Sequence, residues 1–299
     1  MLNRKPVKII ASIMSVVILL SSLPILPVFG YMPGYELTPA VLVSGIASRN
    51  IVKYPGTARE KTVFPPSSDQ ILAAIDTSAC LNLAAFAATG DWDRLADAIT
   101  PAVNKVLADS SCNPDGTTKD NVGINWSYGP VTQYEKNSRF EFCYDWRLDP
   151  MDNAKLLSGY IDYVCRSTGH SKVNIVGFSM GSAITMAYIQ QFGYDKIAGL
   201  VLSAPACNGV KCAGEPYNKM IKINPLAVYR YIETILSGNS KKDIVTAVSA
   251  VLYKAGVINI VADFANKLVE NCLDRIYSDV MLRTFASMPG MWSLIPDEY

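Results

Sequence analysis

Residues 177–181, near the middle of the chain, most constrain what this sequence can fold into. They read Gly-Phe-Ser-Met-Gly, a Gly-x-Ser-x-Gly pattern that places a serine on a sharp turn between a strand and a helix. Glycine is required at Gly177 and Gly181 because a side chain at either position would hold the strand and the helix apart. The pattern makes the hydroxyl of Ser179 a candidate nucleophile.

The segments around this turn have the expected character. The β-branched residues Val173, Ile175 and Val176 precede it, as is typical of a buried parallel strand. Small and then apolar residues follow over 181–189 and predict a helix, whose free N–H groups and positive dipole would face a developing oxyanion. A second apolar strand is predicted over 196–205. The order strand, turn, helix, strand predicts an α/β fold with a mostly parallel sheet and flanking helices.

Another short apolar strand is predicted over 40–46, and it ends in a glycine turn. The loop after such a strand supplies one backbone donor to the oxyanion in this class of site. We expect that donor to be the N–H of Ile46, and the second to be the N–H of Met180, directly after the nucleophile. An ordinary strand end is the alternative interpretation of 40–46.

The general base is the missing part of the site. A serine hydroxyl needs an adjacent base, nearly always a histidine, and this chain has one histidine, His170. The strand over 173–177 separates His170 from Ser179, and at ~3.3 Å per residue it places them on the order of 20 Å apart. His170 is therefore not expected to be the base.

Composition narrows the class of protein. A chain of 299 residues, half of them hydrophobic, suits one large α/β domain or two small ones. The 27 basic and 26 acidic residues nearly balance, which gives no support for nucleic-acid binding. The cysteine spacings do not resemble a zinc site, and with one histidine we expect neither a metal nor a cofactor.

Residues 1–30 have the features of a secretory signal. A basic start is followed by an apolar run over 9–23 and by a small-residue cleavage site ending at Gly30. A retained N-terminal membrane anchor is the alternative. Export would permit disulfides among the seven cysteines; Cys207 with Cys212 and Cys80 with Cys112 are two candidate pairs.

The remaining segments are assigned more coarsely. Residues 67–109 are predicted to be a helical insert, in which Thr100 and Pro101 begin a new helix as N-cap and first residue. A loop is predicted over 114–125. Asp145 and Arg147 end a predicted strand over 139–147, where they could pair and order the loop beside the site.

The ordered combination of Tyr144-Asp-Trp-Arg147, a helix and the elbow at Ser179 resembles the lecithin:cholesterol acyltransferase family. Residues 41–46 share the resemblance, which covers roughly 38–205, although Ser44 stands where the family commonly has proline. The family implies an α/β-hydrolase fold, a Ser-Asp-His triad, a cap over the site and acyl transfer from lipid esters. It also implies Ser179 as nucleophile and Ile46 and Met180 as oxyanion donors.

The C-terminal third of the chain departs from the pattern of that family. In this fold the acid and then the histidine follow the nucleophile along the chain, yet residues 216–285 are predicted to be helices. None of their acids is a convincing triad member, because each lies within a predicted helix (Asp243, Asp263, Asp274, Asp279). We expect a hydrolase core over 31–206 and a helical cap over 207–299, with the last core strands absent.

Three explanations for the missing base stay open: a chain that stops before its catalytic Asp and His, a non-catalytic secreted lipid-binding relative, and an enzyme with an unusual base. Under the first explanation the protein is a secreted serine acyl-hydrolase or O-acyltransferase, and these 299 residues are inactive on their own. Its expected partners are a lipid or other ester and, transiently, a membrane or lipoprotein surface. The sequence does not predict an oligomeric state.

Overall fold

The computed structural model describes residues 37–128, 140–227, 229–230, 253–254 and 256–299. The chain divides into two compact units, Met1–Leu37 and Thr38–Tyr299, and the elements below all belong to the second. The expected signal over 1–30 and the acid Asp243 lie outside the described residues.

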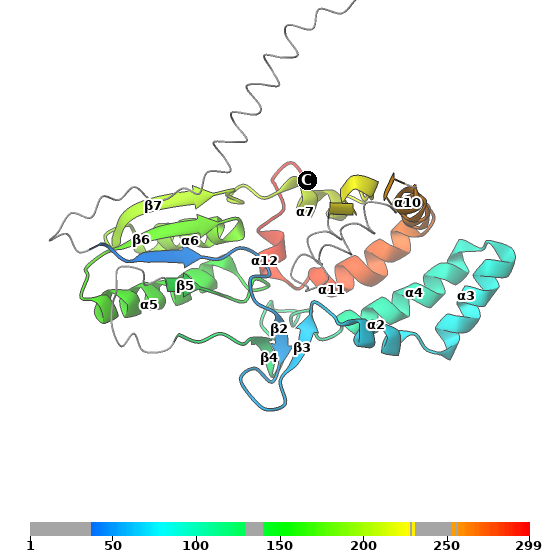
Figure 1. Ribbon diagram of the computed structural model, residues 1–299, viewed down its shortest axis with the longest axis horizontal. Coiled ribbons are helices and arrows are strands. Elements are labelled where there is room, and N and C mark those ends of the chain that lie inside the picture. The colour runs from blue at the N-terminus through cyan, green and yellow to red at the C-terminus, as the bar shows by residue number, and fades with distance from the viewer. Residues whose placement is uncertain (1–36, 129–139, 228, 231–252, 255) are drawn as a thin grey trace, which may run out of the picture. The chain divides into compact units, whose positions relative to one another are not determined.

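A four-stranded parallel sheet carries the elbow. Its strands are β1 (Ala40–Val43), β5 (Phe140–Phe142), β6 (Val173–Phe178) and β7 (Ile197–Ser203), in the spatial order β5-β1-β6-β7 (Figure 1). The chain leaves β1 toward one edge and returns to its other side at β6, so the direction of winding reverses beside β1. In parallel α/β sheets such a reversal opens a crevice at the carboxyl ends of the strands, and here it lies between β1 and β6.

Two helices cover one face of this sheet. α5 (Pro150–Thr168) and α6 (Met180–Phe192) pack against each other and against the strands. Val41 and Val43 are fully buried on that face, whereas Leu42 between them is 40% exposed. Side chains alternate between the two faces of a strand, so within the described residues the second face of the sheet is largely open.

A small antiparallel sheet, not predicted from the sequence, follows β1. It consists of β2 (Ile51–Lys53), β3 (Lys61–Phe64) and β4 (Val122–Ile124), in the order β3-β2-β4. β4 lies within the segment 114–125 that was expected to be a loop, so that expectation was wrong for its last residues. Three-residue strands carry too little periodicity to be recognised before their partners are known.

The insert is helical, as expected, and comprises α2 (Ser68–Ala74), α3 (Thr77–Thr89) and α4 (Trp92–Leu107). A capping box at Ser67 and Gln70 begins α2, and the side chain of Asp76 caps α3. The predicted helix start at Pro101 was wrong, because α4 runs through it. The buried face of α4, including Leu95 and Ala98, outweighs the single hydrogen bond that proline removes.

Helices also dominate the described part of the C-terminal third. They are α7 (Lys211–Tyr217), α10 (Val257–Ile276), the π-helix η1 (Tyr277–Leu282), α11 (Arg283–Phe285) and α12 (Pro289–Trp292). Asp263 and Asp274 lie on α10, and Asp279 on η1. No helix within the described ranges combines the length and the apolar character that crossing a membrane requires.

The two disulfides considered from the sequence are not formed. All seven cysteines are free thiols: Cys80, Cys207 and Cys212 are exposed, Cys165 is half-buried, and the others are buried (Cys112, Cys143, Cys272). A pair close in sequence, such as Cys207 and Cys212, still requires side chains that converge, and the loop and helix between them do not bring the sulfurs together.

Candidate active site

Ser179 occupies the strained turn that the sequence pattern predicts. It stands between β6 and α6 with φ 53° and ψ −122°, a region that a non-glycine residue enters only when its surroundings hold it there. Its N–H donates to the carbonyl of Ser203 at 2.9 Å, and its own carbonyl accepts from Ser182 and Ala206. These bonds tie the elbow to the end of β7 and hold the strain in place.

The two elbow glycines permit the close packing that this turn needs. A Cβ on Gly181 would lie 2.1 Å from the carbonyl oxygen of Val43, and one on Gly177 would lie 2.9 Å from the Cα of Ser182. The first contact brings the start of α6 against the end of β1, and the second brings α6 against its own strand. Any side chain at Gly181 would move the helix away from the site.

The loop after β1 lies beside Ser179, the candidate nucleophile. Val43 pairs with Gly177 in the sheet, and a Cβ on Gly45 would be 3.2 Å from the Cβ of Ser179. Neither Ile46 nor Met180 donates its backbone N–H to another described residue. The structure thus brings Ser179 and the loop that carries Ile46 to one point, with Met180 adjoining.

A polar cluster that the sequence did not predict anchors this loop. The hydroxyl of Ser44 donates to Glu141 at 2.8 Å, and Arg49 pairs with the same carboxylate at 3.1 Å. Arg49 also donates to the thiol sulfur of Cys143, whose pKa is raised by burial. Glu141 and Cys143 belong to the end of the neighbouring strand, so the cluster fixes both ends of residues 44–49. The alternation of Phe140, Glu141 and Phe142 was the available signal.

His170 lies at the opposite end of β6 from Ser179. It follows α5, with its Nδ1 2.9 Å from the carbonyl oxygen of Thr168, and all six residues of β6 separate it from the elbow. Since His170 is the only histidine of the 299 residues, Ser179 has no imidazole partner in this chain. The hydroxyl of Ser179 also has no hydrogen-bond partner among the described residues.

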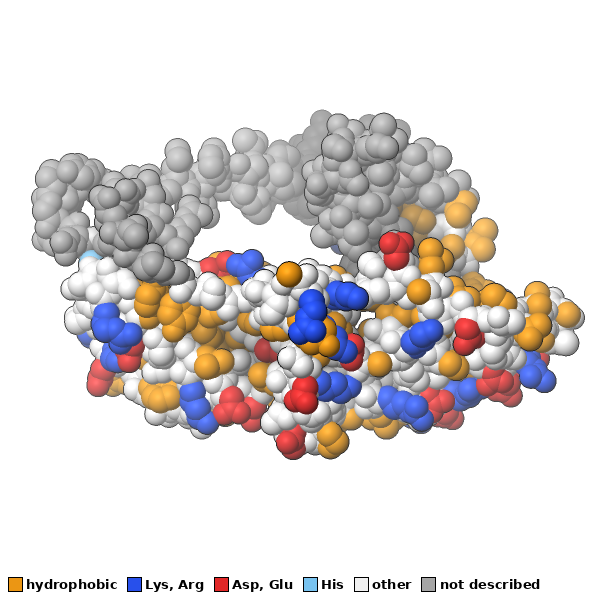
Figure 2. Space-filling view, turned by 90° about the horizontal axis from the view of Figure 1, so that it is seen from below, with side chains coloured by type: hydrophobic (Ala, Val, Ile, Leu, Met, Phe, Trp, Pro, Cys, Tyr) orange, Lys and Arg blue, Asp and Glu red, His pale blue; other side chains and the backbone are white. Residues whose placement is uncertain are grey.

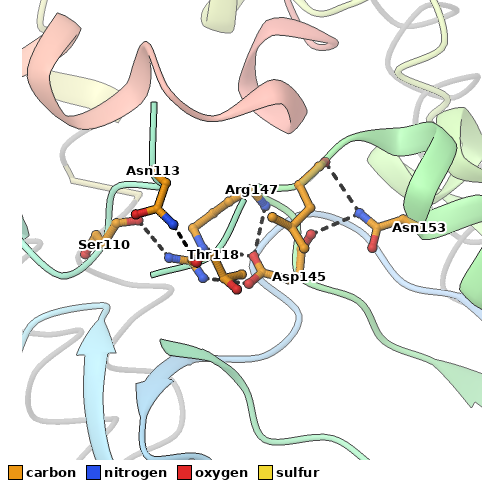
Figure 3. A network of polar contacts seen from close by, with 7 residues as sticks. Ser110, Asn113, Thr118, Asp145, Arg147 and Asn153 are labelled. Carbon is orange, nitrogen blue, oxygen red and sulfur yellow. Dashed lines mark hydrogen bonds and ion pairs between the residues drawn. The ribbon is translucent and has the colours of Figure 1, made fainter. Parts of the chain in front are cut away.

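Asp145 and Arg147 form a buried ion pair (Figure 3). The guanidinium donates to both carboxylate oxygens, from Nε at 2.9 Å and from Nη2 at 2.6 Å. Its Nη1 donates to the carbonyl of Ser110 at 3.0 Å, and Asn153 donates to the carbonyl of Asp145. The pair thus joins the loop after β5 to the end of the insert and the start of α5. These partners give it a structural role, and none belongs to the elbow.

The comparisons with known proteins agree with this geometry. A family model described as the alpha/beta hydrolase fold matches residues 120–230, a range that holds β5, α5, β6, the elbow, α6 and β7. No match is found among curated proteins or among solved structures. The parallel sheet, the elbow and this match together give the chain an α/β-hydrolase fold, which supports a hydrolase type of function.

Proposed function

We propose that this protein is a secreted serine acyl-hydrolase or O-acyltransferase that acts on lipid esters through Ser179. The observation that carries the proposal is the strained backbone of Ser179 with the loop of Gly45 in contact with it. A chance Gly-x-Ser-x-Gly turn would require neither the strain nor a second loop at the same point.

The proposed reaction has two halves. The Oγ of Ser179 attacks the ester carbonyl carbon while a histidine removes its proton, and the backbone N–H groups of Ile46 and Met180 hold the oxyanion. Each donor contributes about 3 kcal/mol to transition-state binding. The tetrahedral intermediate collapses, the histidine protonates the departing alcohol, and an acyl-enzyme remains. Water or a second alcohol then takes the acyl group.

The histidine and its orienting Asp come, in this proposal, from outside the 299 residues. The basis is the place of His170 at the far end of β6 and its status as the only histidine. Two acids of the described helices have other partners: Asp274 pairs with Lys219 and Asp279 with Arg275. This chain alone is then expected to hold an assembled nucleophile and oxyanion site without a base.

The lipid-ester substrate rests on the resemblance of Tyr144–Arg147 and the elbow to the lecithin:cholesterol acyltransferases. A lipid or other ester is the proposed partner, met transiently at a membrane or lipoprotein surface. Secretion rests on the signal-like residues 1–30, with an N-terminal anchor as the alternative.

One observation favours a second function. A serine without an imidazole would be retained in a non-catalytic lipid-binding relative, in which the elbow serves only to join β6 and α6. Such a protein would bind lipids and show no reactivity at Ser179 under any condition.

Chemical rescue with imidazole distinguishes the catalytic function from the non-catalytic lipid-binding function. Added imidazole should act as the missing base, so the full chain should hydrolyse a p-nitrophenyl ester in an imidazole-dependent way. Imidazole cleaves such esters by itself, so the measured quantity is the rate in excess of a Ser179→Ala variant. A Ser171→Ala variant, which changes an exposed serine at the other end of β6, should behave as the parent. Equal rates for the parent and Ser179→Ala at every imidazole concentration would reject the catalytic proposal.

A further inference from the structure

The helical insert contains a cavity that the proposed reaction does not use. Its volume is about 330 Å³, within the lower range of small-molecule sites. Every residue of its wall is apolar. The wall is formed by Pro66, directly before the insert, and by residues of the insert that include Ile71, Ala74, Ile75, Ala79, Ala98 and Ala102. No strand of either sheet and no residue of the elbow contributes to it.

The shape of the cavity follows from the sizes of these side chains. Alanines at its floor are buried, with Ala74, Ala79 and Ala98 each at most 6% exposed, and their small size leaves the space above them. Ile71 and Ile75 on α2 remain more than a third exposed while lining the same space. The cavity therefore opens outward between large apolar side chains. Figure 2 shows that hydrophobic side chains interrupt the charged ones on the surface of the chain.

This wall chemistry selects the occupant. Because the cavity opens outward, its apolar wall is in contact with water, and covering such a wall with hydrocarbon is favourable. The wall offers an occupant no hydrogen bonds. The occupant must therefore present a hydrocarbon segment and keep any polar group outside.

A smaller hollow adjoins the cavity and supplies a polar end. It has a volume of about 230 Å³ and shares Ala74 and Val106 with the apolar wall, while Lys105 and Asp109 add charge. Asp109 is paired with Lys53 at 3.0 Å. Lys105 donates to the carbonyl of Ala73 at 3.3 Å and, among the described residues, forms no ion pair. A cation thus lies next to the hydrocarbon-selective space.

We propose that the insert binds one free fatty acid, with its acyl chain in the α2–α3–α4 cavity and its carboxylate at Lys105. This site is separate from Ser179 and does not depend on catalysis there. A Ser179→Ala variant keeps it, so failure of the proposed reaction leaves this binding intact. The site gives the protein a place to hold a single-chain product or effector of lipid cleavage.

The test is a calorimetric titration of the full chain with dodecanoate below its micellar concentration. Saturable binding with one site is expected. Ala102→Leu and Ala98→Val each add methyl groups to the cavity and should weaken binding at least tenfold. Ala88→Leu adds the same volume as the first of these on an exposed part of α3 outside the wall, and should bind as the parent does. Urea unfolding midpoints of all variants establish that the cavity variants fold.

The charge is tested separately. Lys105→Gln should weaken dodecanoate binding several-fold and leave the binding of neutral dodecanol unchanged. Lys172→Gln, which changes an exposed lysine directly before β6, should change neither. Unchanged dodecanoate binding in Lys105→Gln would overturn the assignment of the carboxylate. Three results would overturn the fatty-acid site itself. They are no saturable binding of dodecanoate, dodecanoate affinities of both folded cavity variants equal to that of the parent, and binding of the chain to phosphatidylcholine vesicles only.

Discussion

The buried ion pair of Asp145 and Arg147 predicts a large loss of stability when one charge is removed alone. The Arg147 side chain is fully buried and that of Asp145 is 7% exposed, so an Asp145→Asn change leaves a guanidinium without its counter-charge and without water. Breaking a buried pair in this way costs about 3–5 kcal/mol. Against a total stability of about 5–15 kcal/mol for a typical domain, this would remove about a fifth or more.

Urea unfolding followed by circular dichroism measures the effect. With a slope of about 3 kcal/mol per molar urea at the upper end for small proteins, the midpoint should fall by roughly 1–1.7 M. The matched control is Asp152→Asn, which breaks the exposed pair with Lys155, whose side chain is 61% exposed, and should cost less than about 1 kcal/mol.

A double variant tests the reasoning more sharply. Adding Arg147→Met to Asp145→Asn removes the stranded charge, so the double variant should lose less than the sum of the two single losses. An Asp145→Asn protein that loses no more stability than Asp152→Asn would refute the assignment of a buried, uncompensated charge.

Three further predictions concern other parts of the molecule. Gly181→Ala places a Cβ 2.1 Å from a backbone oxygen and should lower the free energy of unfolding, measured with urea, by about 3 kcal/mol. Its control is Gly159→Ala in α5, where the added Cβ meets nothing within 4 Å and should stabilise the fold by roughly 0.5–1 kcal/mol. Equal effects of the two changes would contradict the packing argument. Burial raises the pKa of Tyr217 to about 12 from 10.0 and raises that of Cys272 above 9.0. The folded chain therefore keeps protons that the unfolded chain releases, and the urea midpoint should fall as the pH rises from 9 toward 12; a constant midpoint would contradict this sign. Finally, within the described part of the chain β7 is an edge strand, and its Val201 is 58% exposed. Sedimentation velocity should therefore show concentration-dependent association that Val201→Lys reduces; a parent chain that stays monomeric with a cooperative melt would argue against it.

Much of the parallel core could be predicted because its signals are local. The β-branched run before Gly177, the small residues after Ser179 and the apolar strand after α6 each follow from neighbours in sequence, and the α/β-hydrolase fold they predict is confirmed. The helical insert was predictable for the same reason, since 3.6-residue periodicity marks it, although the helix start predicted at Thr100 and Pro101 was wrong.

Contacts between distant segments were not predictable. The three-stranded sheet joins residues near 51, 62 and 123, and the Glu141–Arg49 pair spans 92 residues. The pairing of Arg147 with Asp145 was expected, but the hydrogen bond from Arg147 to the carbonyl of Ser110 was not, because Ser110 belongs to no recognisable sequence pattern.

The sequence by itself determined the candidate nucleophile, the order of the core elements and the absence of a nearby imidazole. The first two follow from local patterns of glycine and apolar residues, and the third follows from the length of the strand between His170 and Ser179. Only the tertiary structure decided that Gly45 contacts Ser179, that α4 continues through Pro101, and that small alanines of three helices leave a common cavity. Each of these depends on which surfaces meet in space, and packing energy between segments far apart in the chain is not encoded in the pattern of either segment alone.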